Sequence, residues 1–210
     1  MGYLALNLKQ YGPPGSALEL VELPYEHPRN NEAVVSIDAV GMHIADGLTA
    51  RGEEILKPLN STPGFEGVGT VKALGNNVNF LKEGDKVLLP MGTGSMRQEL
   101  RINALELTKV KQPYTDDQQL ALITVNGFTA YFLLKDFVKL KQGDWLIQNA
   151  ANSNVGRYLI ALSKLHSIKT VNIVRREAII PELKALGATE IIIDKEHRKK
   201  EVLSRILKKN

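Results

Sequence analysis

The sequence predicts an α/β protein that is built from two successive parts. Short apolar runs broken by turn residues fill residues 1–110, which is typical of a small barrel or sandwich. Beyond them, strand-like runs alternate with amphipathic helical patterns, which indicates a parallel sheet with helices between its strands. The period changes near residue 125, so we expect a β-rich domain over residues 1–125 and a β/α domain over residues 126–210.

Composition places the chain among globular proteins. Its 210 residues suffice for a sizeable core, and 43% of them are hydrophobic. No run of about 18 apolar residues occurs, so we expect no membrane association. The chain has no cysteine and its four histidines form no paired ligand motif, which argues against disulfides and metal sites. The N-terminus lacks a signal-peptide pattern. This predicts a cytoplasmic protein, or a mitochondrial matrix protein if the source is eukaryotic and a transit peptide has been removed.

The net charge of +4 comes from the end of the chain. Residues 195–210 contain seven Lys or Arg and two acidic residues, which leaves 20 basic and 21 acidic residues in residues 1–194. Such a basic tail can contact phosphate backbones, but a solvated helix face is its more common role. The charge pattern therefore argues against nucleic acid as a partner.

The first part of the chain reads as strands separated by turns. Residues 1–7 already have strand character, and Pro13-Pro14-Gly15, Gly75-Asn76-Asn77 and Glu83-Gly84-Asp85 mark turns. Strands are predicted over residues 33–40, 67–74 and 86–90.

Helical patterns begin after Thr115. Asp116 and Asp117 supply acidic capping residues for a helix that includes Leu120 and Ile123. A longer helix is predicted from about residue 127 to residue 138.

Residues 142–157 form the candidate nucleotide-binding segment. A Gly-Asp turn precedes an apolar run, small and amide residues follow it, and helical spacing then begins. A loop between a strand and a helix N-terminus can direct backbone N–H groups at a phosphate. Only Gly156 remains of a G-x-G-x-x-G pattern, so we expect Asn152 and Asn154 to adopt the positive φ that other nucleotide loops give to glycine. An ordinary turn between a strand and a helix is the alternative.

A second buried strand is predicted over residues 169–174, with Arg175 and Arg176 directly after it. These arginines follow the loop by about 20 residues, where a dinucleotide fold places the group that contacts the adenosine ribose. That group is an acid for NAD and an arginine for the 2′-phosphate of NADP, which guanidinium groups bind with charge and paired hydrogen bonds. The sequence thus favours NADPH, with two solvated arginines at a strand end as the alternative.

The remaining sequence continues the alternation of helix and strand. Pro181 suits the first turn of a helix that Gly187 ends. Residues 190–194 form a third short apolar run, and residues 202–207 carry one apolar stripe. These features predict a helix, a strand and a last helix.

Several motifs together resemble those of one protein family. Asp46 and Gly52 match the N-P-x-D…G segment of the medium-chain dehydrogenase/reductase superfamily, and Phe65 stands where its zinc-dependent members have a histidine ligand. Within the zinc-independent members, the chain is most similar to the 2-enoyl thioester reductases of mitochondrial type. Quinone oxidoreductases share the framework but usually carry a Gly-Gly pair in the phosphate loop. The other matching motifs are Pro63-Gly64-Phe65-Glu66-Gly67-Val68-Gly69, Gly94-Ser95-Met96-Arg97, Val125-Asn126-x-x-Thr129-Ala130-Tyr131, Gln148-Asn149-Ala150-x-Asn152-Ser153-x-Val155-Gly156 and Thr170-Val171-Asn172-x-Val174-Arg175.

The resemblance implies a GroES-like β-barrel domain over residues 1–125 and a partial Rossmann domain that binds NADPH over residues 126–210. It implies hydride transfer from NADPH to C3 of a trans-2-enoyl thioester, followed by protonation at C2. The substrate would be an enoyl-CoA or an enoyl-ACP, and the protein a homodimer. The implied cofactor residues are Asn152, Ser153, Val155 and Gly156 around the pyrophosphate, Arg175 and Arg176 at the 2′-phosphate, and Asn126 and Thr129 on the nicotinamide side.

The chain departs from the family in its catalytic residues and its length. The family's tyrosine after the N-P-x-D segment is absent, Glu53 and Glu54 stand in its place, and His43 replaces the family's Asn. The catalytic residues are therefore unassigned, with Asp46 and Glu54 as candidates for a proton donor. Family members also continue through a second βαβ half, so the chain resembles a C-terminally truncated member. We expect a fragment, a degenerate copy, or a chain that another polypeptide completes.

Three functions stay open from the sequence. The first is NADPH-dependent reduction of enoyl thioesters. A quinone or other activated-alkene reductase is the alternative if the missing tyrosine reflects a different substrate. The third is a noncatalytic protein that binds nucleotide or RNA through Arg175, Arg176 and the basic tail.

Overall fold

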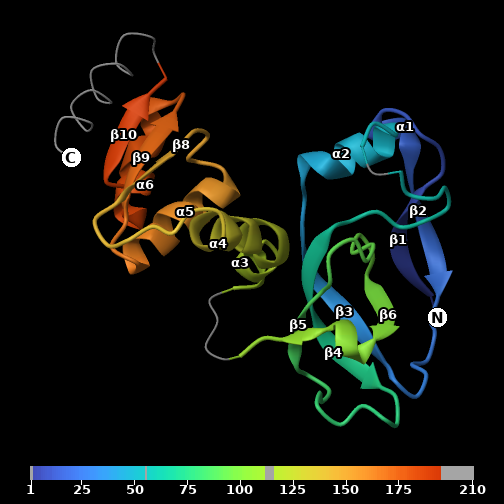
Figure 1. Ribbon diagram of the computed structural model, residues 1–210. Coiled ribbons are helices and arrows are strands. Elements are labelled where there is room, and N and C mark those ends of the chain that lie inside the picture. Colours follow the sequence, from blue (N-terminus) through green and yellow to red (C-terminus); the bar gives the residue numbers. More distant parts are fainter. Residues whose placement is uncertain (1, 55, 112–115, 195–210) are drawn as a thin grey trace. The chain divides into compact units, whose positions relative to one another are not determined.

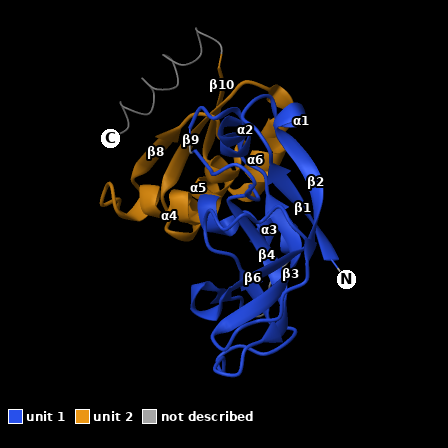
Figure 2. Cartoon of the chain, turned by 90° about the vertical axis from the view of Figure 1, so that its right-hand side faces the viewer, with its two compact units in different colours: residues 1–125 blue, residues 126–210 orange. Residues whose placement is uncertain are grey.

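The computed structural model describes residues 2–54, 56–111 and 116–194 (Figure 1). The chain divides into two compact units, residues 1–125 and residues 126–210 (Figure 2). The described strands of the first unit pair antiparallel, and those of the second pair parallel. The predicted α/β class is therefore confirmed.

A five-stranded antiparallel sheet forms the centre of the first unit, in the order β6-β3-β4-β5-β7. The strands predicted over residues 33–40, 67–74 and 86–90 are its three middle strands, and the last of them ends two residues early. Val35, Val71 and Val87 are almost fully buried on its core face. The strands are β3 (Glu32–Gly41), β4 (Glu66–Leu74), β5 (Lys86–Leu88), β6 (Glu99–Asn103) and β7 (Thr108–Lys109).

A two-stranded hairpin at the start of the chain is joined to this sheet. Its elements are β1 (Gly2–Leu8), α1 (Pro14–Ala17) and β2 (Leu18–Pro24). The Leu6 N–H donates to Met96 O, and the Gln98 N–H donates to Leu4 O, both at 2.9 Å. These bonds connect β1 to the segment that leads into β6, so the hairpin and the sheet form one β structure.

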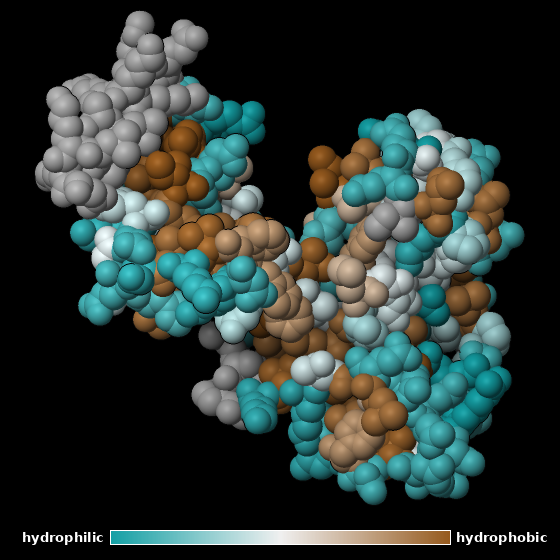
Figure 3. All heavy atoms as spheres, viewed as in Figure 1, coloured by the Kyte–Doolittle hydropathy of each residue, from teal (hydrophilic) through white to brown (hydrophobic). Residues whose placement is uncertain are grey.

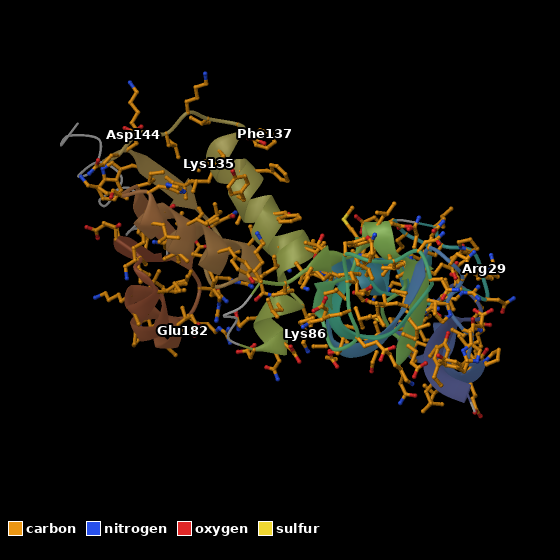
Figure 4. All side chains as sticks on the ribbon, turned by 90° about the horizontal axis from the view of Figure 1, so that it is seen from below. Arg29, Lys86, Lys135, Phe137, Asp144 and Glu182 are labelled. Atoms are coloured by element: carbon orange, nitrogen blue, oxygen red, sulfur yellow. The ribbon has the colours of Figure 1, made fainter. Side chains whose placement is uncertain are left out.

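The helical segments of the first unit are short. They are α2 (Ile44–Arg51), the 3-10 turn η1 (Ala104–Glu106), α3 (Asp117–Leu120) and the π-helix η2 (Ile123–Gly127), which extends two residues past the unit boundary. The helix that the sequence predicted to include Leu120 and Ile123 is thus divided between α3 and η2. Glu66 is the reason, because its Oε2 accepts the Val125 N–H at 2.6 Å and takes that group out of a regular helix. The start of α3 is held by Lys86, whose Nζ lies 3.0 Å from Asp117 Oδ2 (Figure 4).

The second unit has a three-stranded parallel sheet in the order β10-β9-β8. The strand predicted over residues 169–174 is β9, and the helix predicted near residues 127–138 is α4, which is shorter at both ends. The strands are β8 (Trp145–Gln148), β9 (Lys169–Val174) and β10 (Glu190–Ile193), and the helical segments are α4 (Phe128–Lys135), α5 (Asn154–Leu165), η3 (Glu177–Ile179) and α6 (Ile180–Leu186). In the part of the chain that the structure describes, no helix is long and apolar enough to cross a membrane.

Helix α6 begins and ends as its sequence predicted. Pro181 lies in its first turn, and Gly187 ends it with a φ of 117° that a side chain would strain. Leu183 of α6 packs with Ile160 of α5 and with Val174 of β9 in one core cluster. The helix predicted over residues 202–207 lies outside the described residues. Because the strands are parallel, their carboxyl ends share one edge of the sheet, which places the loop after β8 beside the residues after β9 and β10.

Candidate functional site

The loop between β8 and α5 ends in a capped helix N-terminus. Ser153 has extended backbone angles, and its Oγ accepts the Gly156 N–H at 3.1 Å. The Ser153 N–H in turn donates to Ala150 O at 2.8 Å. Helix α5 has 12 residues, so its N-terminus carries the partial positive charge that attracts anions.

The expected positive φ of Asn152 and Asn154 is wrong. Among the described residues of this loop, Ala150 has the positive φ, at 45°. Asn154 is the first residue of α5 and takes helical angles. The chain therefore reverses four residues before the helix begins, and the Asn side chains are not needed for that reversal.

Gly156 permits a close approach between this loop and α5. A Cβ at this position would lie 2.6 Å from Ala151 O and 2.8 Å from Ala151 Cα. Real Cβ atoms do not approach backbone atoms so closely, so any side chain here must move the loop. The last glycine of the G-x-G-x-x-G pattern has the same role of close packing in dinucleotide folds.

A hollow of about 380 Å³ lies at the carboxyl ends of the three parallel strands. Both arginines are exposed, but only Arg175 belongs to the described lining of this hollow. The structure thus brings Arg175 together with the residues of the α5 N-terminus. The polar and small residues of the lining are Asn149, Ala150, Asn152, Ser153, Arg175 and Asp194.

A second hollow of about 620 Å³ shares part of this lining and extends along β8. Val155 and Gly156 line it together with Leu133 of α4 and Ile147 of β8. The remaining predicted cofactor residues lie elsewhere. Asn126 is buried within η2 and Thr129 is exposed in the first turn of α4, and neither lines these two hollows.

A buried polar network supports the loop, and sequence reasoning did not assign it. Gln148 Nε2 donates to Gly156 O at 3.1 Å and to Asn172 Oδ1 at 2.7 Å. Asn172 is fully buried, and its Nδ2 donates to Thr170 Oγ1 at 2.8 Å and to Glu190 O at 3.0 Å. All three strands therefore hold the first turn of α5 in place. Two amide residues inside apolar strand patterns are the signal that could have revealed the network.

In the first unit, a second polar group lies where β3 leads into α2. The His43 N–H donates to Asp46 Oδ2 at 2.8 Å, which caps the helix. The imidazole Nε2 of His43 lies 2.7 Å from Oε1 of Glu66, whose side chain is 0% exposed. Gly41 makes room for this carboxylate, because a Cβ there would lie 2.7 Å from the same oxygen. The buried carboxyl of Glu66 therefore lies against the half-buried imidazole of His43, a contact that the sequence did not predict.

Asp46 and Glu54 are in different surroundings. Asp46 is buried, its Oδ1 has no hydrogen-bond partner among the described residues, and burial raises the pKa of its carboxyl. The His43 N–H and the charges of His43 and Lys57 oppose this rise in pKa. Burial also lowers the pKa of Lys57, and the neighbouring charge of Arg97 adds to that effect. Glu54 is exposed two residues after Gly52, which ends α2.

Metal ligands do not cluster in the part of the chain that is described. Within residues 2–54, 56–111 and 116–194, no group of three or more His, Asp or Glu side chains is placed to hold a metal ion. Phe65 stands where the family resemblance would place a zinc-ligand histidine. Its ring packs edge to face with that of His43, and the two ring centres lie 6.3 Å apart.

Comparison with known proteins agrees with these motifs. The GroES-like domain of alcohol dehydrogenases matches residues 29–132. The mitochondrial enoyl-acyl-carrier-protein reductase of Arabidopsis thaliana is 33% identical over 205 residues, which cover 95% of this chain and 55% of that protein. The chain belongs to the medium-chain dehydrogenase/reductase superfamily. It spans about half the length of the curated relatives that it matches.

Solved structures of this superfamily match both units. Etr1p, an enoyl thioester reductase from Candida tropicalis, solved with NADP and crotonyl-CoA, superposes with a TM-score of 0.86 at 26% identity, covering 92% of this chain and 61% of that chain. A quinone oxidoreductase from Pseudomonas syringae superposes with a TM-score of 0.82 at 28% identity, covering 98% of this chain and 63% of that chain. The relatives are thus oxidoreductases of two substrate classes.

Proposed function

We propose that the second unit binds NADPH and that the protein reduces the 2,3 double bond of an enoyl thioester. One observation carries the proposal: a single hollow is lined by the capped N-terminus of α5 and by Arg175. In dinucleotide folds the helix N-terminus holds the pyrophosphate, and an arginine after the next strand contacts the 2′-phosphate.

The residues of the loop suit this ligand. Asn152 and Ser153 would contact the pyrophosphate at the helix N-terminus, and Val155 and Gly156 would line its continuation along β8. Arg175 would pair with the 2′-phosphate, while Arg176, which lies outside the lining, would add positive charge beside it. Asn126 and Thr129 are assigned to the nicotinamide side by resemblance to the family.

The reaction needs a hydride at C3 and a proton at C2 of the substrate. NADPH supplies the hydride when it is bound. Of the two candidate carboxyls for the proton, Asp46 is the better one, because its raised pKa keeps it protonated closer to neutral pH. Glu54 is exposed to water and has no comparable shielding.

Calorimetric titration with NADPH and NADH tests the cofactor assignment. Charge-assisted bonds to the 2′-phosphate are worth about 1.5–3 kcal/mol, so we expect NADPH to bind at least about tenfold more tightly than NADH. Arg175→Glu should remove this preference and leave NADH binding unchanged. Arg176→Glu is the matched control. Because Arg176 lies outside the lining of the hollow, this variant should lose less of the preference for NADPH over NADH. Equal losses for both cofactors in Arg175→Glu would refute the assignment.

Turnover then separates the substrate classes. Consumption of NADPH with crotonyl-CoA but not with a quinone would support the proposed reaction. The quinone reductase is the second candidate, favoured by the match to the Pseudomonas syringae enzyme and by the missing tyrosine. Binding of RNA without binding of NADPH would instead support the noncatalytic alternative, whose basic tail lies outside the described residues.

Location and assembly follow from the relatives in the same way. The names of the enoyl reductases that match describe mitochondrial proteins, so we propose the mitochondrial matrix if the source is eukaryotic and the cytoplasm otherwise. A relative of 26% identity is a heterodimer of Etr1p and Etr2p, and we propose a homodimer for this chain. Light scattering on the purified protein would give twice the chain mass for a dimer, and a single chain mass would rule the homodimer out.

A further inference from the structure

Asp194 lines the smaller hollow at the α5 N-terminus, and the proposed function leaves it without a role. It directly follows β10, as Arg175 directly follows β9, and both belong to the lining of the hollow of about 380 Å³. Both residues are exposed, so a ligand can reach them. Hydrophilic residues lie at the top of the second unit in Figure 3, where Figure 1 shows β9 and β10 ending. A carboxyl group thus lines a hollow whose other polar groups suit phosphate, so it suits a different part of the ligand.

Arg175 and Asp194 leave the sheet at the same level. Val174 and Ile193, the residues before them, are paired in the β9–β10 register and share one core cluster. The Asp194 N–H donates to Val174 O at 2.8 Å, so the pairing of the two strands continues to Asp194. Neighbouring strands lie about 4.8 Å apart, and β9 lies between β8 and β10. Asp194 therefore stands one strand further from the loop after β8 than Arg175 does.

The order of the strands matches the order of the groups in a dinucleotide. This step rests on the proposed function, in which the α5 N-terminus holds the pyrophosphate and Arg175 holds the 2′-phosphate. The ribose carbon that carries the 2′-phosphate is bonded to the carbon that carries the base. From the loop after β8 across β9 towards β10, the ligand would therefore present its pyrophosphate, its ribose phosphate and its base. The base is the part that comes within reach of Asp194.

We propose that Asp194 determines the base specificity of this site by accepting a hydrogen bond from the exocyclic amino group of adenine. An ionised carboxylate only accepts hydrogen bonds, and this amino group is the donor on the adenine edge. A keto group in its place, as in hypoxanthine, presents an acceptor to the carboxylate, and the bond is lost. Contact with the 2′-phosphate is the poorer arrangement for Asp194, because the two negative charges repel each other.

Asp194→Asn tests the carboxylate with the smallest change of shape. An amide both donates and accepts, so this variant can bond to the amino group of adenine or to the keto group of hypoxanthine. Glu177→Gln is the matched control, because it removes the same charge from an exposed residue that follows Arg175 by two positions and lies outside the described lining of the hollow. Both substitutions are at exposed positions, so both variants should fold, and thermal unfolding followed by Trp145 fluorescence would verify this.

The test is calorimetric titration of the whole chain with NADPH and with reduced nicotinamide hypoxanthine dinucleotide phosphate, which differs from NADPH in the base alone. We expect the wild type and Glu177→Gln to prefer NADPH by about tenfold, the share of one charge-assisted hydrogen bond. Asp194→Asn should bind the two dinucleotides within about twofold of each other, because its amide can pair with either base. The ratio is taken within each variant, so a general loss of affinity cancels.

The results that would overturn the inference differ in what they mean for the proposed function. Equal binding of the two dinucleotides by a wild type that still prefers NADPH to NADH would overturn the base contact alone. An Asp194→Asn variant that keeps the preference, or that binds both dinucleotides more tightly by the same factor, would show that the carboxylate does not contact the base. Absence of binding for both dinucleotides in the wild type would overturn the proposed function together with the inference.

Discussion

Replacing Asn172 with alanine should destabilise the second unit by about 3 kcal/mol. The change removes three hydrogen bonds, from Gln148 Nε2 and to Thr170 Oγ1 and Glu190 O, each worth about 1 kcal/mol net. Two of the partners keep another bond, because Gln148 still donates to Gly156 O and Thr170 Oγ1 still accepts the Thr189 N–H. The additional cost of unpaired groups should therefore be small.

Trp145 provides the assay for this substitution. It is the single tryptophan of the chain, it lies in β8, and Lys169 Nζ is 5.4 Å from the centre of its ring. Its fluorescence should follow unfolding of the sheet, and a loss of about 3 kcal/mol corresponds to a lower Tm by roughly 12–24 °C for a domain of this size. Asn154→Ala is the control, since Asn154 is exposed in the first turn of α5. A loss below about 1 kcal/mol for Asn172→Ala would show that the network does not stabilise the sheet.

Three further substitutions test other features. Gly156→Ala should lower the free energy of unfolding, followed by Trp145 fluorescence, by about 1–3 kcal/mol and weaken NADPH binding, because the new Cβ would overlap Ala151. An unchanged free energy of unfolding would contradict the close packing. Leu183→Ala should cost about 2–5 kcal/mol in the same assay, because this side chain is fully buried, and a smaller loss would mean that the core readily closes around the gap. Burial raises the pKa of Asp46 above 3.8, so its ionisation destabilises the folded state as pH rises through that range. Asp46→Asn should therefore raise the Tm measured by scanning calorimetry at pH 7 but leave it unchanged at a pH below the ordinary carboxyl pKa. A higher Tm at both pH values would show that ionisation of Asp46 is not what destabilises the wild type.

The helices and strands that the sequence predicted correctly are those whose conformation is set by their own residues. The residues from Lys169 to Val174 have the pattern of a buried strand and form one. Gly187 can end α6 because glycine adopts a positive φ without strain. The helix predicted to begin after the small-residue loop is α5. Local chemistry was sufficient at these positions.

The errors arose where distant residues set the local conformation. Asn152 and Asn154 tolerate positive φ better than Ala150, yet the packing of the loop gives that conformation to Ala150. The pattern around Leu120 suits one continuous helix, but Glu66, 59 residues from Val125 in the sequence, divides it. Neither outcome could be read from the neighbouring residues.

The candidate site was accessible to sequence reasoning only in part. Arg175 and Ser153 belong to recognisable motifs, and the structure places them at one hollow. The polar group of His43, Asp46 and Glu66 is formed from separate stretches of the first unit, and the unpaired Oδ1 of Asp46 becomes visible only when burial is known.

The buried carboxylate of Glu66 has an evolutionary consequence. It contacts His43 at the start of α2 and the Val125 backbone in η2, so three segments depend on one side chain. A lone change of Glu66 to an apolar residue would remove the carboxyl oxygen that accepts the Val125 N–H, while a lone change of His43 would leave the buried carboxyl with one fewer partner. This chain keeps Glu66 of the family motif although His43 replaces the family's Asn. Position 43 should therefore change only to side chains that still offer the buried carboxyl of Glu66 a partner.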